Sequence, residues 1–173
     1  MKKYWERFYQ QGHTLEPSEF AKEYTKMFYK DLNIIDVLAG NGRDTLYLQK
    51  KGFSVKGIDF AFEGNGVEKM SLRELFKNEC HWDVVYSRFG IHCLKNRDIK
   101  KLIRWTKEYI ALEFRTKGDI PKLYHHKRHF INPDKIVKYL LSSGFTKIYI
   151  KYGYNMATFK DENPLICRIY ANK

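Results

Sequence analysis

Hydrophobic and polar residues follow two different spacings along this chain, and the two spacings alternate. Apolar runs such as 33–38 have the length of buried strands, whereas apolar side chains in 16–30 recur at helical spacing behind Ser18, a suitable N-cap. The pattern predicts strands at 33–38, 53–60, 82–89, 109–115, 145–152 and 165–173, and helices at 16–30, 41–52, 70–79, 97–108 and 132–144. This alternation predicts an α/β fold in which a mostly parallel, doubly wound sheet carries helices on both faces.

The length and composition favour one domain. A chain of 173 residues with 43% hydrophobic content can bury one sizeable core, and no linker or repeat divides it. We therefore expect a single domain over 1–173, with an N-terminal lid and leading helix in 1–31 and an α/β core in 32–173. The N-terminal residues lack the apolar stretch of a signal peptide, and no segment approaches the roughly 20 apolar residues of a membrane span. A cytoplasmic protein is the expectation.

Cysteine and histidine spacing does not suggest a metal or disulfide framework. The cysteines are three in number, far apart, and lack a C-x-x-C pair. The loop histidines His125, His126 and His129 have no cysteine or acid at ligand spacing beside them, so we expect no metal.

The net charge of +12 is the strongest compositional deviation. It is compatible with a nucleic-acid partner, an anionic small substrate, or a basic surface exposed to solvent. The lysines are spread along the whole chain, which weakens the nucleic-acid interpretation and favours a solvated basic surface.

A glycine turn and an acidic residue follow the first two predicted strands. Ala39, Gly40, Asn41 and Gly42 lie between the first strand and its helix, where glycines allow a tight turn and close approach of a ligand to free N–H groups. Asp59 ends the second strand, where a carboxylate can accept hydrogen bonds from ribose hydroxyls. A dinucleotide fingerprint would have a third glycine where this chain has Thr45. These features predict a nucleoside site at the carboxyl ends of the strands.

The stretch 36–42, "DVLAGNG", resembles the first motif of class I S-adenosylmethionine-dependent methyltransferases, an acidic residue followed by x-G-x-G-x-G. Leu38 stands where that family most often has its first glycine. The segments "GIDFA", "WDVVYSRFGIHCL" and the final pair of strands extend the resemblance over nearly the whole chain. It implies a Rossmann-like sheet of seven strands with the last antiparallel, and S-adenosylmethionine as cofactor with S-adenosylhomocysteine as product.

The same resemblance implies the residues that hold the cofactor. Asp36 and the backbone of 39–42 would hold the methionyl end, Asp59 the ribose, and Ser87 with Arg88 would flank the sulfonium. The implied cofactor residues are Tyr4, Trp5, Asp36, Leu38, Ala39, Gly40, Asn41, Gly42, Arg43, Asp44, Asp59, Phe60, Ser87 and Arg88. Tyr4 and Trp5 would form a lid, or alternatively anchor the N-terminus in the core.

Two family features are thin. No acidic residue clearly ends a third strand near 66–71 to meet the adenine amino group, and no glycine turn precedes the fifth strand. The chain therefore reads as a trimmed version of the fold, and a non-catalytic partner subunit that binds the cofactor stays open as an alternative.

Arginines and histidines that follow the fourth and fifth strands point to an anionic acceptor. These residues, with one glutamate, are Arg88, His92, Glu113, Arg115, Arg128 and His129. Arginine matches phosphate or carboxylate bidentately, and histidine takes a proton near neutral pH. The interpretation makes His92 or His129 the base and Glu113 its orienting group, while the arginines hold the acceptor's charge.

Each of these residues also has a structural interpretation. His92 could be a buried histidine at a helix start, Glu113 and Arg115 could pair across the sheet, and Arg128 with Lys127 could belong to a loop surface.

The segments "YSRF", "EFR", "RHFI" and "FKDENP" resemble small bacterial methyltransferases that accompany capsule and other surface-polysaccharide genes. That resemblance implies methyl transfer to an oxygen or nitrogen of a phosphate-bearing sugar, polyol or nucleotide-linked precursor. An RNA or DNA methyltransferase is the alternative enzyme. Against it, the Asn-Pro-Pro-aromatic motif and a Pro-Cys nucleophile are absent, and Cys93 lies in an apolar context. The sequence does not indicate an oligomeric state.

Overall fold

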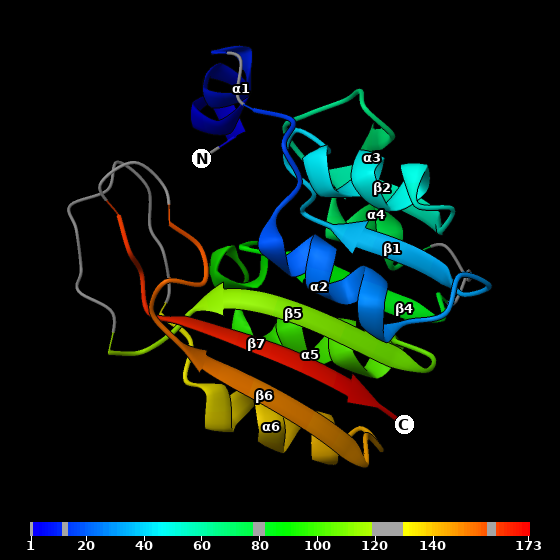
Figure 1. The fold of residues 1–173 in the computed structure, drawn as a ribbon, viewed down its shortest axis with the longest axis vertical. Coiled ribbons are helices and arrows are strands. Elements are labelled where there is room, and N and C mark those ends of the chain that lie inside the picture. Colours follow the sequence, from blue (N-terminus) through cyan, green and yellow to red (C-terminus); the bar gives the residue numbers. More distant parts are fainter. Residues whose placement is uncertain (1, 12–13, 78–81, 119–129, 159–161) are drawn as a thin grey trace.

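A seven-stranded sheet lies at the centre of the computed structural model, which describes residues 2–11, 14–77, 82–118, 130–158 and 162–173 (Figure 1). The strands are β1 (Asn33–Val37), β2 (Ser54–Asp59), β3 (Val67–Lys69), β4 (Val84–Arg88), β5 (Tyr109–Arg115), β6 (Lys147–Gly153) and β7 (Ile166–Asn172), in the order β3-β2-β1-β4-β5-β7-β6. Strand β7 runs opposite to the other six strands and pairs antiparallel with β5 and β6. The predicted fold class is confirmed.

Helices cover both faces of the sheet. They are α1 (Lys2–Gln10), α2 (Glu19–Met27), α3 (Arg43–Lys50), α4 (Leu72–Leu75), α5 (Asn96–Trp105), α6 (Pro133–Leu141) and the short 3₁₀ helix η1 (Ile91–Cys93). In Figure 1, α2 crosses the near face while α5 and α6 lie behind the strands. Neighbouring residues of β1 divide between the layers: Ile34 belongs to the buried cluster that includes residues of α2 and α3, and Ile35 belongs to the cluster that includes residues of α4, α5 and α6. This alternation is the physical basis of the two buried layers.

Three elements differ from the sequence-based prediction. The strand β3 has only three residues, two of them charged, which is too short to show a period. The helix α4 ends at Leu75, well before the predicted 79, and a capping box between Ser71 and Glu74 begins it. The helix α1 was not predicted from spacing; its aromatic side chains pack against one another and against Phe62 in the loop after β2.

Helix α3 packs closely on β2 because of a glycine in the strand. The fingerprint position that is usually glycine holds Thr45, and the space for its side chain comes from Gly57 on β2. A Cβ atom on Gly57 would lie 2.7 Å from Thr45 Oγ1 and 2.8 Å from Val67 Cγ2. The close approach of helix and strand is therefore kept, with the small residue on the strand instead of the helix.

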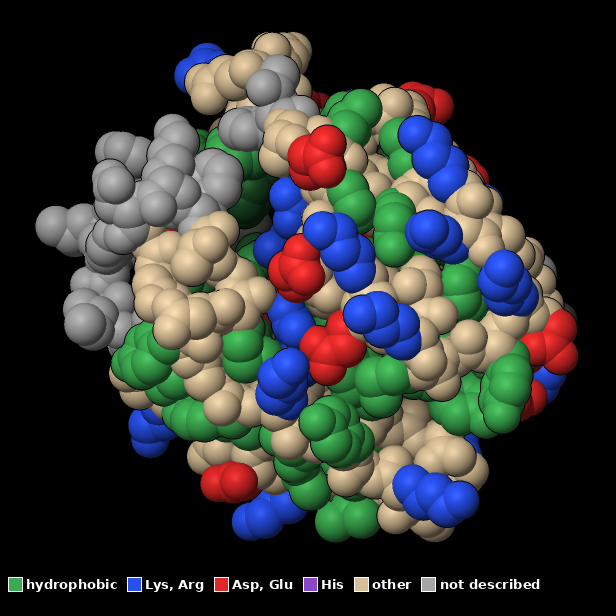
Figure 2. Space-filling view, viewed as in Figure 1, with side chains coloured by type: hydrophobic (Ala, Val, Ile, Leu, Met, Phe, Trp, Pro, Cys, Tyr) green, Lys and Arg blue, Asp and Glu red, His purple; other side chains and the backbone are tan. Residues whose placement is uncertain are grey.

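Basic side chains are distributed over the surface without forming one patch on the visible face. Figure 2 shows Lys and Arg side chains spread singly over this face, with Asp and Glu side chains between them and some basic groups sunk in the hollow beside α2. No helix in the described parts of the chain has the length and apolar character needed to cross a bilayer.

Candidate functional site

The turn after β1 is built from left-handed backbone at three positions. Leu38 has φ 60°, Gly40 has φ 62° and Gly42 has φ 77°. Leucine in this conformation is strained, which explains why the resembling family favours glycine at that position. Strand β4, which lies beside β1 in the sheet, is also followed by a residue with left-handed backbone, because Phe89 has φ 54°. Strained residues thus flank the point where the strand order reverses, between β1 and β4.

Gly42 has no room for a side chain. A Cβ atom there would lie 2.6 Å from the backbone oxygen of Asn65 and 2.8 Å from Val67 Cγ2. Gly42 also precedes α3 as its N-cap without a side-chain cap bond, so the first turn of α3 keeps free N–H groups toward the turn. An anionic group of a ligand would be stabilised there.

Asp59 joins the turn to the loop after β2. Its Oδ2 accepts a hydrogen bond from the N–H of Gly40 at 3.1 Å, and its Oδ1 accepts one from the N–H of Ala61 at 2.8 Å. The side chain is 2% exposed, and burial raises its pKa, while these backbone bonds oppose the rise. A carboxylate has about four acceptor positions, so Asp59 keeps capacity for ligand hydroxyls beyond its backbone bonds.

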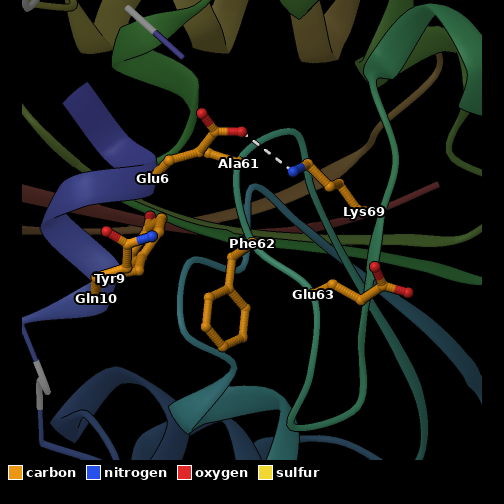
Figure 3. Close-up of a pocket in the computed structure, with 7 residues that line it drawn as sticks. All are labelled: Glu6, Tyr9, Gln10, Ala61, Phe62, Glu63 and Lys69. Carbon is orange, nitrogen blue, oxygen red and sulfur yellow. Dashed lines mark hydrogen bonds and ion pairs between the residues drawn. The ribbon is translucent and has the colours of Figure 1, made fainter. Parts of the chain in front are cut away.

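Helix α1 lies over this turn and encloses a cleft with the loop after β2 (Figure 3). The cleft has a volume of about 430 Å³, within the range of small-molecule sites. It is lined by Glu6, Tyr9, Gln10, Ala61, Phe62, Glu63 and Lys69. Glu6 Oε1 and Lys69 Nζ, 3.1 Å apart, bridge α1 to the end of β3 across the cleft.

Tyr9 is the α1 residue closest to the glycine turn. Its hydroxyl lies 3.0 Å from the position that a Cβ on Gly40 would occupy, and its ring contacts Phe62 edge to face at 5.4 Å. Burial, together with the charge of Asp59, raises the pKa of Tyr9. The family resemblance instead implied Tyr4 and Trp5 as a lid over the cofactor, or alternatively as an anchor of the N-terminus in the core. Those two rings pack against each other at 5.3 Å, and neither is among the residues lining the cleft.

The structure therefore adds Tyr9 and Phe62 to the candidate site. The aromatic repeat of α1, at positions 4, 5, 8 and 9, was the available sequence signal, because these positions share one side of a helix. It could not show which ring faces the turn.

The two other predicted acids near the turn make their bonds inside the protein. Asp36 Oδ2 accepts a hydrogen bond from Thr45 Oγ1 at 2.7 Å, and burial raises the pKa of Asp36 to about 8. Asp44 accepts bonds from the N–H and hydroxyl of Ser18 at 2.8 and 2.7 Å and from the Tyr86 hydroxyl at 3.0 Å. Asp44 thus ties the start of α2 to α3 and holds the frame on which the turn rests.

Ser87, also predicted at the cofactor, connects the two strands at the switch point. Its hydroxyl donates to the backbone oxygen of Val37 at 2.8 Å, and it is fully buried. A Cβ on Gly90 would lie 2.6 Å from this hydroxyl oxygen, so the chain after β4 passes directly over Ser87. Phe60, another predicted cofactor residue, is half-buried directly after Asp59.

A network of ion pairs lies beside the turn, at the ends of β4, β5 and β7. Glu113 is fully buried, with its Oε2 2.6 Å from Arg168 Nε and its Oε1 2.9 Å from Arg88 Nε. Arg168 also pairs with Glu23 and donates to the Met156 carbonyl at 2.8 Å. Burial raises the pKa of Glu113, and the two guanidinium groups oppose that rise.

Arg88 is held less completely than Arg168. Although Arg88 Nε lies close to Glu113 Oε1, the pair lacks hydrogen-bond geometry, and neither atom has another hydrogen-bond partner among the described residues. The guanidinium lies over the Phe89 ring at 4.4 Å, and the side chain is 21% exposed. Its unused donors are available to an anion.

Arg43 is a second incompletely paired cation in the same region. Among the described residues its ion-pair partner is Asp44, with Nε 3.8 Å from Oδ1, and the Asp44 oxygens already accept the bonds from Ser18 and Tyr86. Burial and the neighbouring positive charge of Arg88 lower the pKa of Arg43. Two like charges in a half-buried position favour binding of a negative group between them.

The other predicted acceptor residues divide between buried, paired and undescribed positions. His92 lies in η1, 4% exposed, with its ring 5.9 Å from that of Phe89. Arg115 pairs with Glu162. Arg128 and His129, with the neighbouring loop histidines, lie outside the described residues. Within the described ranges, no three His, Cys, Asp or Glu side chains are grouped so as to hold a metal.

The chain resembles known proteins in its three-dimensional fold and not in its sequence. No protein-family model matches the chain, and no curated protein matches it. Among solved structures, a SAM-dependent methyltransferase from Archaeoglobus fulgidus matches with a TM-score of 0.70 at 17% identity, covering 88% of this chain and 90% of that one.

Two further structures contain ligands. Magnesium protoporphyrin IX methyltransferase from Synechocystis PCC 6803, with bound SAM, matches at TM-score 0.64 and 17% identity, covering 89% of this chain and 76% of that one. The Burkholderia thailandensis 1,6-didemethyltoxoflavin-N1-methyltransferase, with its substrate and S-adenosylhomocysteine, matches at TM-score 0.68 and 13% identity, covering 90% and 79%. The chain therefore has the Rossmann-like fold of these methyltransferases.

Proposed function

We propose that this chain is an S-adenosylmethionine-dependent methyltransferase whose acceptor is a small anionic metabolite. The observation that carries the proposal is the carboxylate of Asp59 bonded to the N–H of Gly40, beneath a cleft that α1 covers. This puts a ribose acceptor, a glycine turn and a small-molecule cleft in one place. The solved structures of the same fold support the cofactor, because two of them hold SAM or its demethylated product.

The residues present fit that cofactor. Asp59 would accept from the ribose hydroxyls, and the turn 39–42 with the free N–H groups of α3 would hold the methionyl carboxylate. Tyr9 and Phe62 line the cleft with aromatic surface suited to a nucleoside. When bound, SAM supplies an already activated methyl group, so the chain's own task is to align the acceptor and manage its proton.

Arg88 and Arg43 are the groups we assign to the acceptor's negative charge. Glu113 would position Arg88 from its buried site, since Arg168 holds the other oxygen of the same carboxylate. We extend this role to Arg115 and Arg128, as the sequence suggested. His92 or His129 would take the acceptor's proton, with the transfer itself proceeding in line and without a metal.

Cofactor binding is tested by titration calorimetry with SAM and S-adenosylhomocysteine. Asp59→Ala removes charge-assisted hydrogen bonds worth about 1.5–3 kcal/mol each, so affinity should fall at least about tenfold. Asp31→Ala, at an exposed position, is the matched control and should bind like the wild type. Circular dichroism must show that the Asp59 variant is folded. Equal binding by a folded Asp59→Ala protein would remove Asp59 from the site, and no binding by the wild type would end the proposal.

The acceptor is tested by transfer of labelled methyl groups into a fractionated cell extract. We expect label in phosphate-bearing small molecules, including the surface-polysaccharide precursors that the family resemblance suggested. Arg88→Ala should reduce labelling by a larger factor than it reduces cofactor affinity, and Arg97→Ala, whose side chain is 78% exposed, is the control. Label in RNA would favour the nucleic-acid alternative. Cofactor binding without label in any fraction would favour a non-catalytic partner subunit.

A further inference from the structure

The strand β6 forms an open edge of the sheet with exposed apolar side chains. It is the last strand in the sheet order, and β7 is its one strand neighbour among the described residues. In Figure 1 it lies at the lower margin of the sheet. Tyr149 and Tyr152 are each 54% exposed, and Ile150 is 43% exposed. An uncovered edge of this length and character is a template for pairing with another strand.

We propose that β6 pairs with β6 of a second copy of this chain, antiparallel and centred on Ile150. In such a dimer a two-fold axis perpendicular to the sheet relates the two copies of β6. Residues that lie opposite one another must point to the same face of the sheet, so the residue on the axis lies opposite its own copy. The choice of this central residue determines which residues of the two strands lie opposite one another. With Ile150 at the centre, all seven residues of β6 are paired.

The charges on β6 favour this register over its neighbours. Centred on Ile150, Lys147 faces Gly153, Ile148 faces Tyr152, and Tyr149 faces Lys151, so no lysine faces a lysine. Moving the centre to Tyr149 would put Lys147 opposite Lys151, and moving it to Lys151 would put that lysine opposite itself. Like charges directly opposite one another destabilise a strand pair.

The two faces of the paired edge would also be compatible with the rest of the fold. On the side of α6, Ile150 would meet its own copy and Ile148 would meet Tyr152, which covers apolar surface that is now exposed. On the side of α2, the Lys151 side chain would lie along the Tyr149 ring, a favourable cation–π pair. Lys147 and Lys151 thus disfavour the neighbouring registers but meet no like charge in the register centred on Ile150.

The net charge of the chain sets the expected salt dependence. Two copies with +12 each repel one another, whereas the proposed contact consists of backbone bonds and apolar side chains. Added salt screens the repulsion, so the dimer should become stronger as salt increases. An interface made of ion pairs would show the opposite trend.

Sedimentation equilibrium of the full chain over a concentration series tests the proposal. The wild type should approach twice the 20.8 kDa mass of one chain, at lower protein concentration in high salt than in low salt. Ile150→Lys places two lysines face to face and should leave a monomer. Leu15→Lys makes the same substitution type at a 50% exposed position away from β6 and should behave like the wild type. A wild-type monomer up to the highest soluble concentration would overturn the proposal.

Oxidative cross-linking tests the register and does not depend on the lysine variant being folded. Ile150→Cys should form a disulfide-linked dimer, because that residue lies opposite its copy. Lys147→Cys lies six residues from its copy, roughly 20 Å along the strand, and should not cross-link beyond the wild-type level. Equal cross-linking of both variants, or none at Ile150→Cys, would refute this interface.

Discussion

The packing of α3 on β2 gives the sharpest test of how this chain departs from the usual fingerprint. We expect Gly57→Ala to destabilise the protein because the new Cβ would lie 2.7 Å from Thr45 Oγ1 and 2.8 Å from Val67 Cγ2. Neither neighbour is the free end of a long side chain. Thr45 is fully buried and donates its hydroxyl to Asp36, and Val67 is 4% exposed.

The magnitude follows from three contributions. Overpacking a buried site costs about 1–3 kcal/mol, and displacing the Thr45 hydroxyl from Asp36 costs about 1 kcal/mol more. Replacing glycine in a strand returns about 0.5–1 kcal/mol of backbone entropy. The net loss in the free energy of unfolding should be about 1–3 kcal/mol. For a chain of this length that lowers Tm by roughly 2–12 °C.

Urea and thermal unfolding measure this loss, and two further variants isolate its cause. Thr45→Ala removes the clashing hydroxyl and methyl, so Gly57→Ala should cost at least about 1 kcal/mol less in that background. Gly153→Ala is the control, because a Cβ there meets no atom nearer than 3.8 Å. If Gly57→Ala were as stable as Gly153→Ala, the close approach would not be what selects glycine. If Thr45→Ala gave no rescue, the contact with Thr45 would not be the cause.

Three further outcomes are expected. Gly42→Ala, at φ 77° and with a carbonyl oxygen 2.6 Å from the new Cβ, should lose at least about 1–3 kcal/mol of stability in urea and most of its cofactor affinity in calorimetry. Burial raises the pKa of Asp36 from 3.8 to about 8, so the folded protein holds a proton that the unfolded chain has released. The free energy of unfolding should therefore fall as pH rises between those values, by up to about 1.4 kcal/mol per unit, and Asp36→Asn should flatten this slope in urea titrations. Glu6→Gln, which breaks the exposed pair with Lys69, should change cofactor affinity less than about fivefold, while Tyr9→Ala should weaken it further in the same calorimetric assay.

Local patterns were sufficient to predict most helices and strands and to propose where the candidate site lies. The apolar run of β1, the glycine turn and the helical spacing of α3 follow one another within 33–50, so their arrangement depends on neighbours in the chain. Asp59 could be assigned from order alone, since adjacent parallel strands bring their carboxyl ends together. The short β3 escaped prediction because three residues are too few to show a period. Helix α1 was not predicted from spacing, although its aromatic residues recur at helical spacing.

Partnerships between distant residues were decided only by the folded chain. The pattern allowed Glu113 and Arg115 to pair across the sheet without naming their partners. Strand β7 runs antiparallel beside β5 and brings Arg168 to the Glu113 carboxylate, whereas Arg115 pairs with Glu162. Likewise, Tyr9 reaches the glycine turn because α1 folds back over the strand ends, and Gly57 makes room for Thr45 on a helix that precedes it in the chain.

The sequence by itself thus determined the order of strands and helices, the glycine turn and the acid that follows β2. Those features depend on backbone preference and on hydrophobic spacing within a few residues. The tertiary structure decided which charges neutralise one another, which aromatic ring covers the turn and which strand is left at the open edge. These depend on side chains that meet across many residues of chain, where local spacing carries no information about distance.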